Sequence, residues 1–312
     1  MQAAVRRRKV RKLILAGKRM ARHNCRMMKL LTAVSVLIAH SASAQKAAPT
    51  AMEVIARIRE HAGVTVRSST VDTFKAGDST SRVTGIAVTM MATLDVLERA
   101  VANGDNLVIT HEPTFYTSRD TLAVLESEND KLLAEKQKYI REHGLIVWRF
   151  HDIPHAMSPD MIRSGVIRAL GWQSFVHGND TEVFDLPRIT LRTLSNRLAE
   201  KLGAKAVRIS GDPESRVAKA VLTQGFWGFA SNRHAIQRAS PDVVIIGEDH
   251  EWETIEYVVD AISAGRIKGL IVLGHVPSEQ AGMEEFARWL RPIVPGVRVD
   301  FVATRDPFRF SR

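Results

Sequence analysis

Short apolar runs alternate with helical stripes over residues 51–312, and this alternation predicts an α/β protein. The stripes carry apolar residues roughly every three or four positions and stop at Gly or Asn-Gly. The runs between them are bounded by turn residues, which is typical of buried strands. We expect helices at 51–63, 93–103, 121–143, 159–171, 194–202, 232–239, 251–264 and 279–290, and strands at 83–89, 107–110, 144–150, 184–190, 207–210, 217–222, 242–247, 267–274 and 297–303.

The order of these elements predicts parallel crossover units in two α/β lobes. We place the first lobe at 51–172 and the second at 216–312. The segment 173–215 is the hardest to assign, and we treat it as a connecting or inserted region. A site fed by strands of both lobes would then lie at strand carboxyl ends, between the lobes.

Three of the predicted strands are followed directly by a histidine. Carboxyl ends of strands face the crevice in which open α/β sheets bind ligands. We therefore expect the three tips to converge at one sheet edge, where imidazole and carboxylate groups would suit zinc, manganese, iron or nickel. The side chains that follow these strands are His111 and Glu112, then His151, Asp152 and His155, and finally His275 and Glu279.

Each motif also has a simpler interpretation. The first could be an exposed polar pair at a strand end, and the second a loop with satisfied histidines, since Pro154 argues against a helix there. The third places Glu279 in the first turn of the helix at 279–290, where a polar residue often caps. The shared architecture of the three motifs argues against coincidence and favours a metal site.

Two neighbouring residues form a further candidate. Glu248 and His250 follow the strand at 242–247 and could line the same crevice, next to the metal ligands or the substrate. The alternative is a solvated acidic start for the helix at 251–264. His177 and His234, which lie outside the three motifs, are expected to tolerate substitution.

The net charge of +10 suggests a polyanion partner only if the leader is counted. Residues 1–44 hold eleven Lys and Arg and no acidic residue, and the rest has 33 basic and 34 acidic residues, a net charge of −1. We therefore expect no nucleic-acid binding.

The segment 28–45 has the pattern of a bacterial secretory signal peptide. A short positive start precedes the apolar run Leu30–Ile38, and Ala42-Ser43-Ala44 resembles a cleavage site. We expect export to the periplasm or medium, with no membrane contact after processing, and translation starting at Met27 or Met28. The only cysteine, Cys25, precedes the cleavage site, so any metal site in the mature chain uses His and carboxylates.

These motifs resemble a known family. The strand ending in His111, the His151-x3-His155 motif with its helix ending at Gly171, the Gly247-Glu248 pair and Gly274-His275-x3-Glu279 are similar to the Nif-three-like dinuclear metal-centre proteins. Members of that family are often labelled type 2 GTP cyclohydrolase I. The resemblance covers most of 51–312.

The resemblance implies two divalent metal ions in a two-lobed α/β subunit that assembles into hexamers. Glu112 stands where the family usually has a second histidine, and His155 where it usually has aspartate. The exchange keeps the number of each ligand type, although Asp152 could serve instead of His155. We expect Glu279 to be the bridging, catalytic carboxylate.

Two functions are compatible with such a site. Two metal ions favour hydrolysis of a small-molecule substrate. The alternative is a non-catalytic periplasmic protein that binds or stores metal. An open position beside a walled pocket would favour the enzyme, and a closed site would favour storage.

Overall fold

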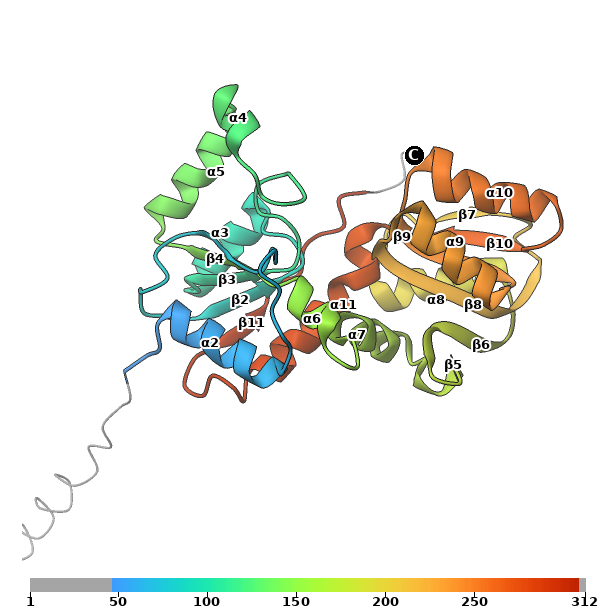
Figure 1. Ribbon diagram of the computed structural model, residues 1–312, viewed down its shortest axis with the longest axis horizontal. Helices are drawn as coiled ribbons and strands as arrows, with labels where there is room; N and C mark the ends of the chain where they lie inside the picture. Colours follow the sequence, from blue (N-terminus) through green and yellow to red (C-terminus); the bar gives the residue numbers. More distant parts are fainter. Residues whose placement is uncertain (1–46, 309–312) are drawn as a thin grey trace, which may run out of the picture. The chain divides into compact units, whose positions relative to one another are not determined.

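The computed structural model describes residues 47–308, of which 48–308 lie in one compact unit that contains two β-sheets (Figure 1). The first sheet has the strand order β1-β4-β3-β2-β11. All of its neighbouring strands are parallel except β1, which is antiparallel to β4. Its strands are β1 (Phe74–Ala76), β2 (Ile86–Thr89), β3 (Leu107–Thr110), β4 (Ile146–Arg149) and β11 (Val299–Phe301).

Helices cover both faces of the first sheet. Ile86, Leu107 and Trp148 lie in the core that also holds the apolar face of α2 (Ala51–Ala62). Val108 and Val147 pack on the other face, with α3 (Leu94–Asn103) and α5 (Lys131–Glu142). Burial on both faces explains why the central strands are continuously apolar and show no alternation.

The second sheet has the strand order β5-β6-β8-β9-β10-β7. Strands β8, β9 and β10 are parallel, and the outer pairs are antiparallel. Its strands are β5 (Val176–His177), β6 (Asp180–Thr190), β7 (Arg208–Ser210), β8 (Arg216–Phe226), β9 (Val243–Glu248) and β10 (Gly269–Val272).

Helices also cover both faces of this sheet. Residues of α7 (Met161–Leu170) and α8 (Leu191–Leu202) share a core with Phe184 and Ile245. Residues of α9 (Gly228–Ala239) and α10 (Glu256–Ser263) pack with Val244 and Ile246 on the opposite face.

The long helix α11 (His275–Leu290) packs against elements of both sheets. Phe286 and Leu290 lie in the core of the first sheet, while Gly282 packs against α7. A Cβ atom at Gly282 would lie 2.5 Å from the Cα of Ile162, and one at Gly165 would lie 2.6 Å from the carbonyl oxygen of Ala281. Only glycine at both positions permits this close crossing of backbones.

The mixed α/β class and the two-lobe arrangement are confirmed, but the division of the chain differs from the expected one. Segment 173–215, expected to be a connection, supplies β5, β6, α8 and β7 to the second sheet, after a 3₁₀ turn at Gln173–Phe175. β11, expected in the second lobe, pairs with β2 in the first sheet. Hydrophobic patterns identify a strand but carry no information about its partner.

Several predicted elements differ in detail. The helix predicted at 121–143 is two helices, α4 (Ala123–Ser127) and α5, because Asn129 has a left-handed φ of 52° and Asp130 caps Leu133. The segment predicted as a loop at 151–155 contains the short helix α6 (Asp152–Ala156), and α11 begins at His275, four residues earlier than predicted. In both, proline lies in the first turn, where its missing N–H breaks no helical bond.

The predicted leader and signal peptide at 1–44, with Cys25, lies outside the described residues. Within 47–308, no helix is both long enough and apolar enough to cross a membrane.

Candidate metal centre

The first sheet brings three histidines together. Thr110 of β3 is level with Arg149 of β4, so the chain beyond each strand carries His111 and His151 to the same edge. Their rings stack with centroids 4.7 Å apart. Helix α6 then turns the chain so that the His155 ring lies 5.1 Å from each of them. One nitrogen of each ring lies within 4.8 Å of the others, which is close enough for one metal ion.

The chain that follows strand β10 of the second sheet contributes two more side chains to the cluster. After β10, helix α11 presents His275 and Glu279 one turn apart, with His275 Nε2 3.2 Å from Glu279 Oε2. Glu279 therefore lies in the second turn of the helix, and the expectation of a first-turn position was wrong. The expectation that all three strand tips share one sheet edge was also wrong, since β10 belongs to the second sheet.

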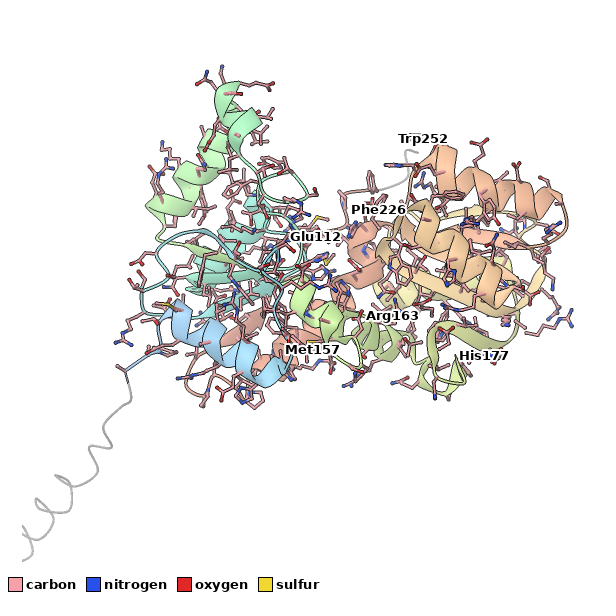
Figure 2. All side chains as sticks on the ribbon, in the orientation of Figure 1. Glu112, Met157, Arg163, His177, Phe226 and Trp252 are labelled. Carbon is pink, nitrogen blue, oxygen red and sulfur yellow. The ribbon has the colours of Figure 1, made fainter. Side chains whose placement is uncertain are left out.

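Carboxylates join the two groups of histidines. Glu112 Oε1 lies 3.1 Å from His275 Nε2 and 3.8 Å from His151 Nε2. Glu279 Oε2 lies 3.8 Å from His111 Nε2. Atoms of His111, Glu112 and Glu279 form a second group that could hold a metal ion. Figure 2 shows Glu112 on the part of the first sheet's edge that faces the second sheet.

The four histidines have a common orientation. Each uses Nδ1 for a hydrogen bond to an oxygen outside the cluster, so that Nε2 is the nitrogen left for a metal ion, although in His275 it also contacts Glu112 and Glu279. This arrangement also sets the tautomer when the Nδ1–H is the donor. The oxygen partners are Phe150 O for His111 (2.9 Å), Asp152 Oδ1 for His151 (3.1 Å), Asp160 Oδ2 for His155 (2.9 Å) and Glu248 Oε1 for His275 (2.8 Å).

Burial and charge give the histidines different proton affinities. Complete burial lowers the pKa of His111 well below its usual value, and the nearby His151 lowers it further. His111 is therefore neutral, and its Nε2 is buried with no hydrogen-bond partner. A buried nitrogen lone pair without a donor is costly in a protein interior and fits a metal ligand.

His275 behaves in the opposite way. Burial alone would lower its pKa, but hydrogen bonds to Glu112, Glu248 and Glu279 outweigh this and raise its pKa to about 12. Burial would raise the pKa of Glu112, but the hydrogen bond from His275 and the charges of nearby imidazoles lower it below its usual range. The carboxylates thus create a strong preference for positive charge at this point, and a divalent cation would satisfy it.

Three supporting residues were missed from the sequence. Asp72 accepts hydrogen bonds from the backbone N–H groups of His151, Asp152 and Ile153, and so fixes the start of α6. Asp160 orients His155, and burial, which alone would lower the pKa of His155, is outweighed by this contact so that the pKa is raised. Neither aspartate is marked in the sequence by spacing from a histidine motif.

Arg149 is the third residue missed. It is 3% exposed, its Nη2 lies 3.3 Å from Glu112 Oε2, and its Nε donates to the carbonyl oxygen of His111. The cation occupies one oxygen of Glu112 and leaves Oε1 for the cluster. The sequence did contain a signal for Arg149, which is a charged residue at the end of the apolar strand β4 and two residues before His151. A charged residue in such a strand needs a buried partner.

Two of the remaining candidates, Asp152 and Glu248, form hydrogen bonds to histidines of the cluster. Asp152 takes hydrogen bonds from Thr70 and Val71 and contacts His151, so it supports a candidate ligand and belongs to neither of the two groups that contain His111. Glu248 supports His275, as the sequence suggested.

Three further histidines lie away from the cluster. His250 pairs with Glu253 at the start of the π-helical turn Glu251–Ile255, which agrees with the alternative interpretation. His177 pairs with Asp185 on the second sheet (Figure 2), and His234 is exposed on α9.

A cavity of about 650 Å³ opens onto the cluster. Glu112, His151, His155, His275 and Glu279 line one side, and residues of β8 and α7 line the other. A second cavity of about 410 Å³, lined by 64–71 and α6, shares His151 and His155 with it. Five of the six candidate ligands, all except the fully buried His111, therefore face space that a small molecule could enter.

Together, the fold and the cluster define a class: a two-sheet α/β protein with a histidine–carboxylate site where the carboxyl ends of strands from both sheets meet. A family model described as Duf34/NIF3 (NGG1p interacting factor 3) matches residues 53–307. The chain belongs to this family, and the resemblance inferred from the motifs is confirmed.

Individual relatives are distant. A GTP cyclohydrolase 1 type 2 homolog of Clostridium acetobutylicum is 23% identical over 160 residues, which cover 48% of this chain and 58% of that protein. The chain thus matches little more than half the length of this relative.

Solved structures show the same fold. The Staphylococcus aureus hypothetical protein SA1388 matches with a TM-score of 0.65 and 16% identity, over 84% of this chain and 100% of that one. A Bacillus cereus protein related to NIF3 matches with a TM-score of 0.65 and 13% identity, over 85% and 100%.

Proposed function

We propose that the chain binds two divalent metal ions and uses them to hydrolyse a small-molecule substrate. The observation that carries the proposal is the common orientation of four imidazoles, whose Nδ1 atoms are bonded to outer oxygens. In three of them, His111, His151 and His275, Nε2 lies within 4 Å of Glu112 or Glu279. The unpartnered Nε2 of buried His111 supports it. The proposed ligands are His111, Glu112, His151, His155, His275 and Glu279.

The residues of the site have distinct roles in this proposal. Two bound metal ions would lower the pKa of a water molecule and stabilise both sides of a hydrolytic displacement. Glu279 would bridge them, because its Oε2 lies within 4 Å of the Nε2 atoms of both His111 and His275. Asp160 and Glu248 hold their histidines in place.

The open cavity favours hydrolysis over metal storage. His151 has 32% of its side chain exposed and His275 has 17%, so solvent and substrate reach the cluster from the cavity. A storage site would be closed by its own ligands. The name of the Clostridium relative refers to GTP cyclohydrolase, and for this chain we propose only the broader class of metal-dependent hydrolase.

Metal analysis tests the proposal. We expect the purified protein to bind about two equivalents of a divalent metal such as zinc, manganese, iron or nickel. His275→Ala should lose at least about one equivalent and most hydrolytic activity towards a panel of ester, amide and phosphoester substrates. His234→Ala is the matched control, since His234 is exposed on α9.

Two outcomes would contradict the proposed metal centre, and a third would contradict hydrolysis. A protein that binds no divalent metal has no such centre. If the His275→Ala variant binds as much metal as the unaltered protein, the metal is held by other ligands. Full metal binding without hydrolysis of any substrate would favour the storage alternative.

We also propose that the chain is exported, cleaved after Ala44 and assembled as a homo-oligomer, a hexamer by family resemblance. Amino-terminal sequencing of the secreted form should begin at Gln45, and an intact cytoplasmic chain would contradict export. The near-zero charge after residue 44 further predicts no tight, salt-sensitive binding of DNA or RNA.

A further inference from the structure

Strand β8 is irregular next to the metal centre. Thr223 is level with Ile246 of β9, whereas Phe226 is level with Glu248, so β8 contains one extra residue. Gly225 lies in this bulge with a left-handed φ of 67°, and its N–H donates to Ser278 Oγ at 2.9 Å. Bulges of this kind redirect a side chain and are common beside active sites.

The bulge places Gln224 in the wall of the cavity. A Cβ atom at Gly225 would lie 2.5 Å from Glu279 Oε1, so the backbone next to Gln224 touches a proposed metal ligand. Gln224 lines the 650 Å³ cavity together with His275 and Glu279. It is a polar residue held directly beside the centre where the chemistry would occur.

Gln224 is buried without a hydrogen-bond partner. Its side chain is 1% exposed, and its Oε1 is buried with no partner among the described residues. A buried amide oxygen normally has a partner, because leaving it without one costs on the order of 1–3 kcal/mol. A ligand in the cavity that forms hydrogen bonds with this amide would remove that cost.

The chemistry of the amide narrows the class of ligand. A glutamine side chain offers one acceptor and one donor side by side, and rotation about its last torsion exchanges them. The complementary group is a cis amide, in which an N–H and a C=O also lie side by side, as in a lactam, imide or hydantoin ring.

Neighbouring side chains fit a flat, uncharged ring. Two aromatic residues, Phe226 and Trp227, line the same cavity, and the Arg163 guanidinium lies over the Trp227 ring. Two guanidinium groups in the wall are already paired with carboxylates, Arg149 with Glu112 and Arg163 with Glu182. They therefore do not select for an anionic group, although Arg119 at the exposed mouth could contact one.

Resting on the proposed hydrolase function, we infer that the substrate is a cyclic amide whose N–H and C=O edge is bound by Gln224. In hydrolysis, water adds to the ring carbonyl carbon, the C–N bond breaks and the nitrogen takes a proton. The products are a carboxylic acid and a free N–H₂ end in one open chain, and water is the only co-reactant.

Binding of two matched probes to the metal-loaded full chain tests this inference. Hydantoin has free N–H groups next to its carbonyls, and 1,3-dimethylhydantoin has none. By isothermal titration calorimetry we expect hydantoin to bind at least about tenfold more tightly, because a site built for an N–H rejects the analogue without it. This comparison uses the unaltered protein and needs no variant.

Variants assign the preference to Gln224. Gln224→Met keeps the length of the side chain but removes both hydrogen-bonding groups, and should reduce the preference to less than about twofold. Gln237→Met, at an exposed position of α9, is the control and should keep the full preference.

The outcomes separate this inference from the proposed function. If the metal content of the samples is normal, three results would overturn the assignment of a cyclic amide. They are equal binding of the two probes, no binding of hydantoin, and a preference that survives in Gln224→Met. Phosphoester hydrolysis by such a protein would then point to Arg119 and an anionic substrate. Samples that hold no metal would overturn the proposed centre, and the inference with it.

Discussion

The two sides of the candidate centre are built from similar residues but have opposite electrostatics. On the side of the first sheet, His111, His151 and His155 approach one another, and burial keeps His111 neutral. On the side of the second sheet, His275 lies among Glu112, Glu248 and Glu279, which hold it protonated. The comparison shows that the surroundings, and not the residue type, decide how each histidine serves a metal site.

This difference predicts two unequal metal positions. An imidazole-rich position suits zinc, iron or nickel, whereas carboxylates add negative charge and also suit manganese. A metal on the carboxylate side must displace the proton of His275, so binding there should release a proton and weaken as the pH falls. The predictions below test this comparison, from the largest expected effect on the centre to the smallest.

The largest effect is expected for His111→Leu. His111 belongs to two candidate metal-binding groups, but only its Nε2 is available to a metal ion, so its loss should lower metal affinity at least about 100-fold at one position. Leucine has a similar volume and no polar atom to bury, so the fold should persist. Plasma mass spectrometry would measure the loss of bound metal, and thermal unfolding would check that the variant is folded. Normal metal content in this variant would show that the two sides are independent of His111.

Gly225→Ala should damage the carboxylate side selectively. The new methyl group would overlap Glu279 and the residue would have to adopt a left-handed φ, so metal affinity at that position should fall about 10-fold to 100-fold. Gly171→Ala is the matched control, because Gly171 also has a left-handed φ but no atom within 4 Å of the added carbon. It should cost only about 1 kcal/mol of stability, with normal metal binding. Equal effects of the two changes would mean that contact with Glu279 is unimportant.

Asp160→Asn should weaken the imidazole side by about tenfold. Asparagine can still cap α7 through Arg163 N, but it holds His155 less firmly than a carboxylate does. Asp185→Asn, which changes the partner of exposed His177, is the control and should leave metal binding unchanged. Metal titration of the two variants side by side makes the comparison, and an unaffected Asp160→Asn protein would remove Asp160 from the centre.

Lys136→Met should alter stability without altering the centre. Lys136 is 3% exposed behind the loop after β3, with its Nζ 2.5 Å from the carbonyl oxygen of Thr114. Burial lowers its pKa to about 8 from 10.5, so the unfolded chain binds more protons between these values. Stability should therefore rise from pH 8 to pH 10.5.

The methionine variant should lack this rise and be more stable than the wild type at pH 7, by on the order of 1–3 kcal/mol. Chemical unfolding at several pH values provides the measurement. An unchanged pH dependence would mean that another group produces it.

The sequence predicted the clustering of the histidines more successfully than their surroundings. The histidines follow short buried strands, which is a local pattern, and the structure does bring His111, His155 and His275 to one place. The sheet to which each strand belongs could not be predicted, because β10 and β11 have similar patterns and join different sheets. The supporting residues Asp72 and Asp160 act through contacts to backbone or side chain that no residue spacing reveals.

The crossing of α7 and α11 at Gly165 and Gly282 has a consequence for metal choice. Gly282 lies one turn beyond Glu279 on the same helix, and at this point the two backbones touch without intervening side chains. Such a contact is far less compressible than one made by flexible side chains. It fixes Glu279 relative to α7 and therefore relative to His155, whose partner Asp160 caps that helix. Discrimination between cations by ionic radius would then be encoded in a pair of glycines that never touch the ion.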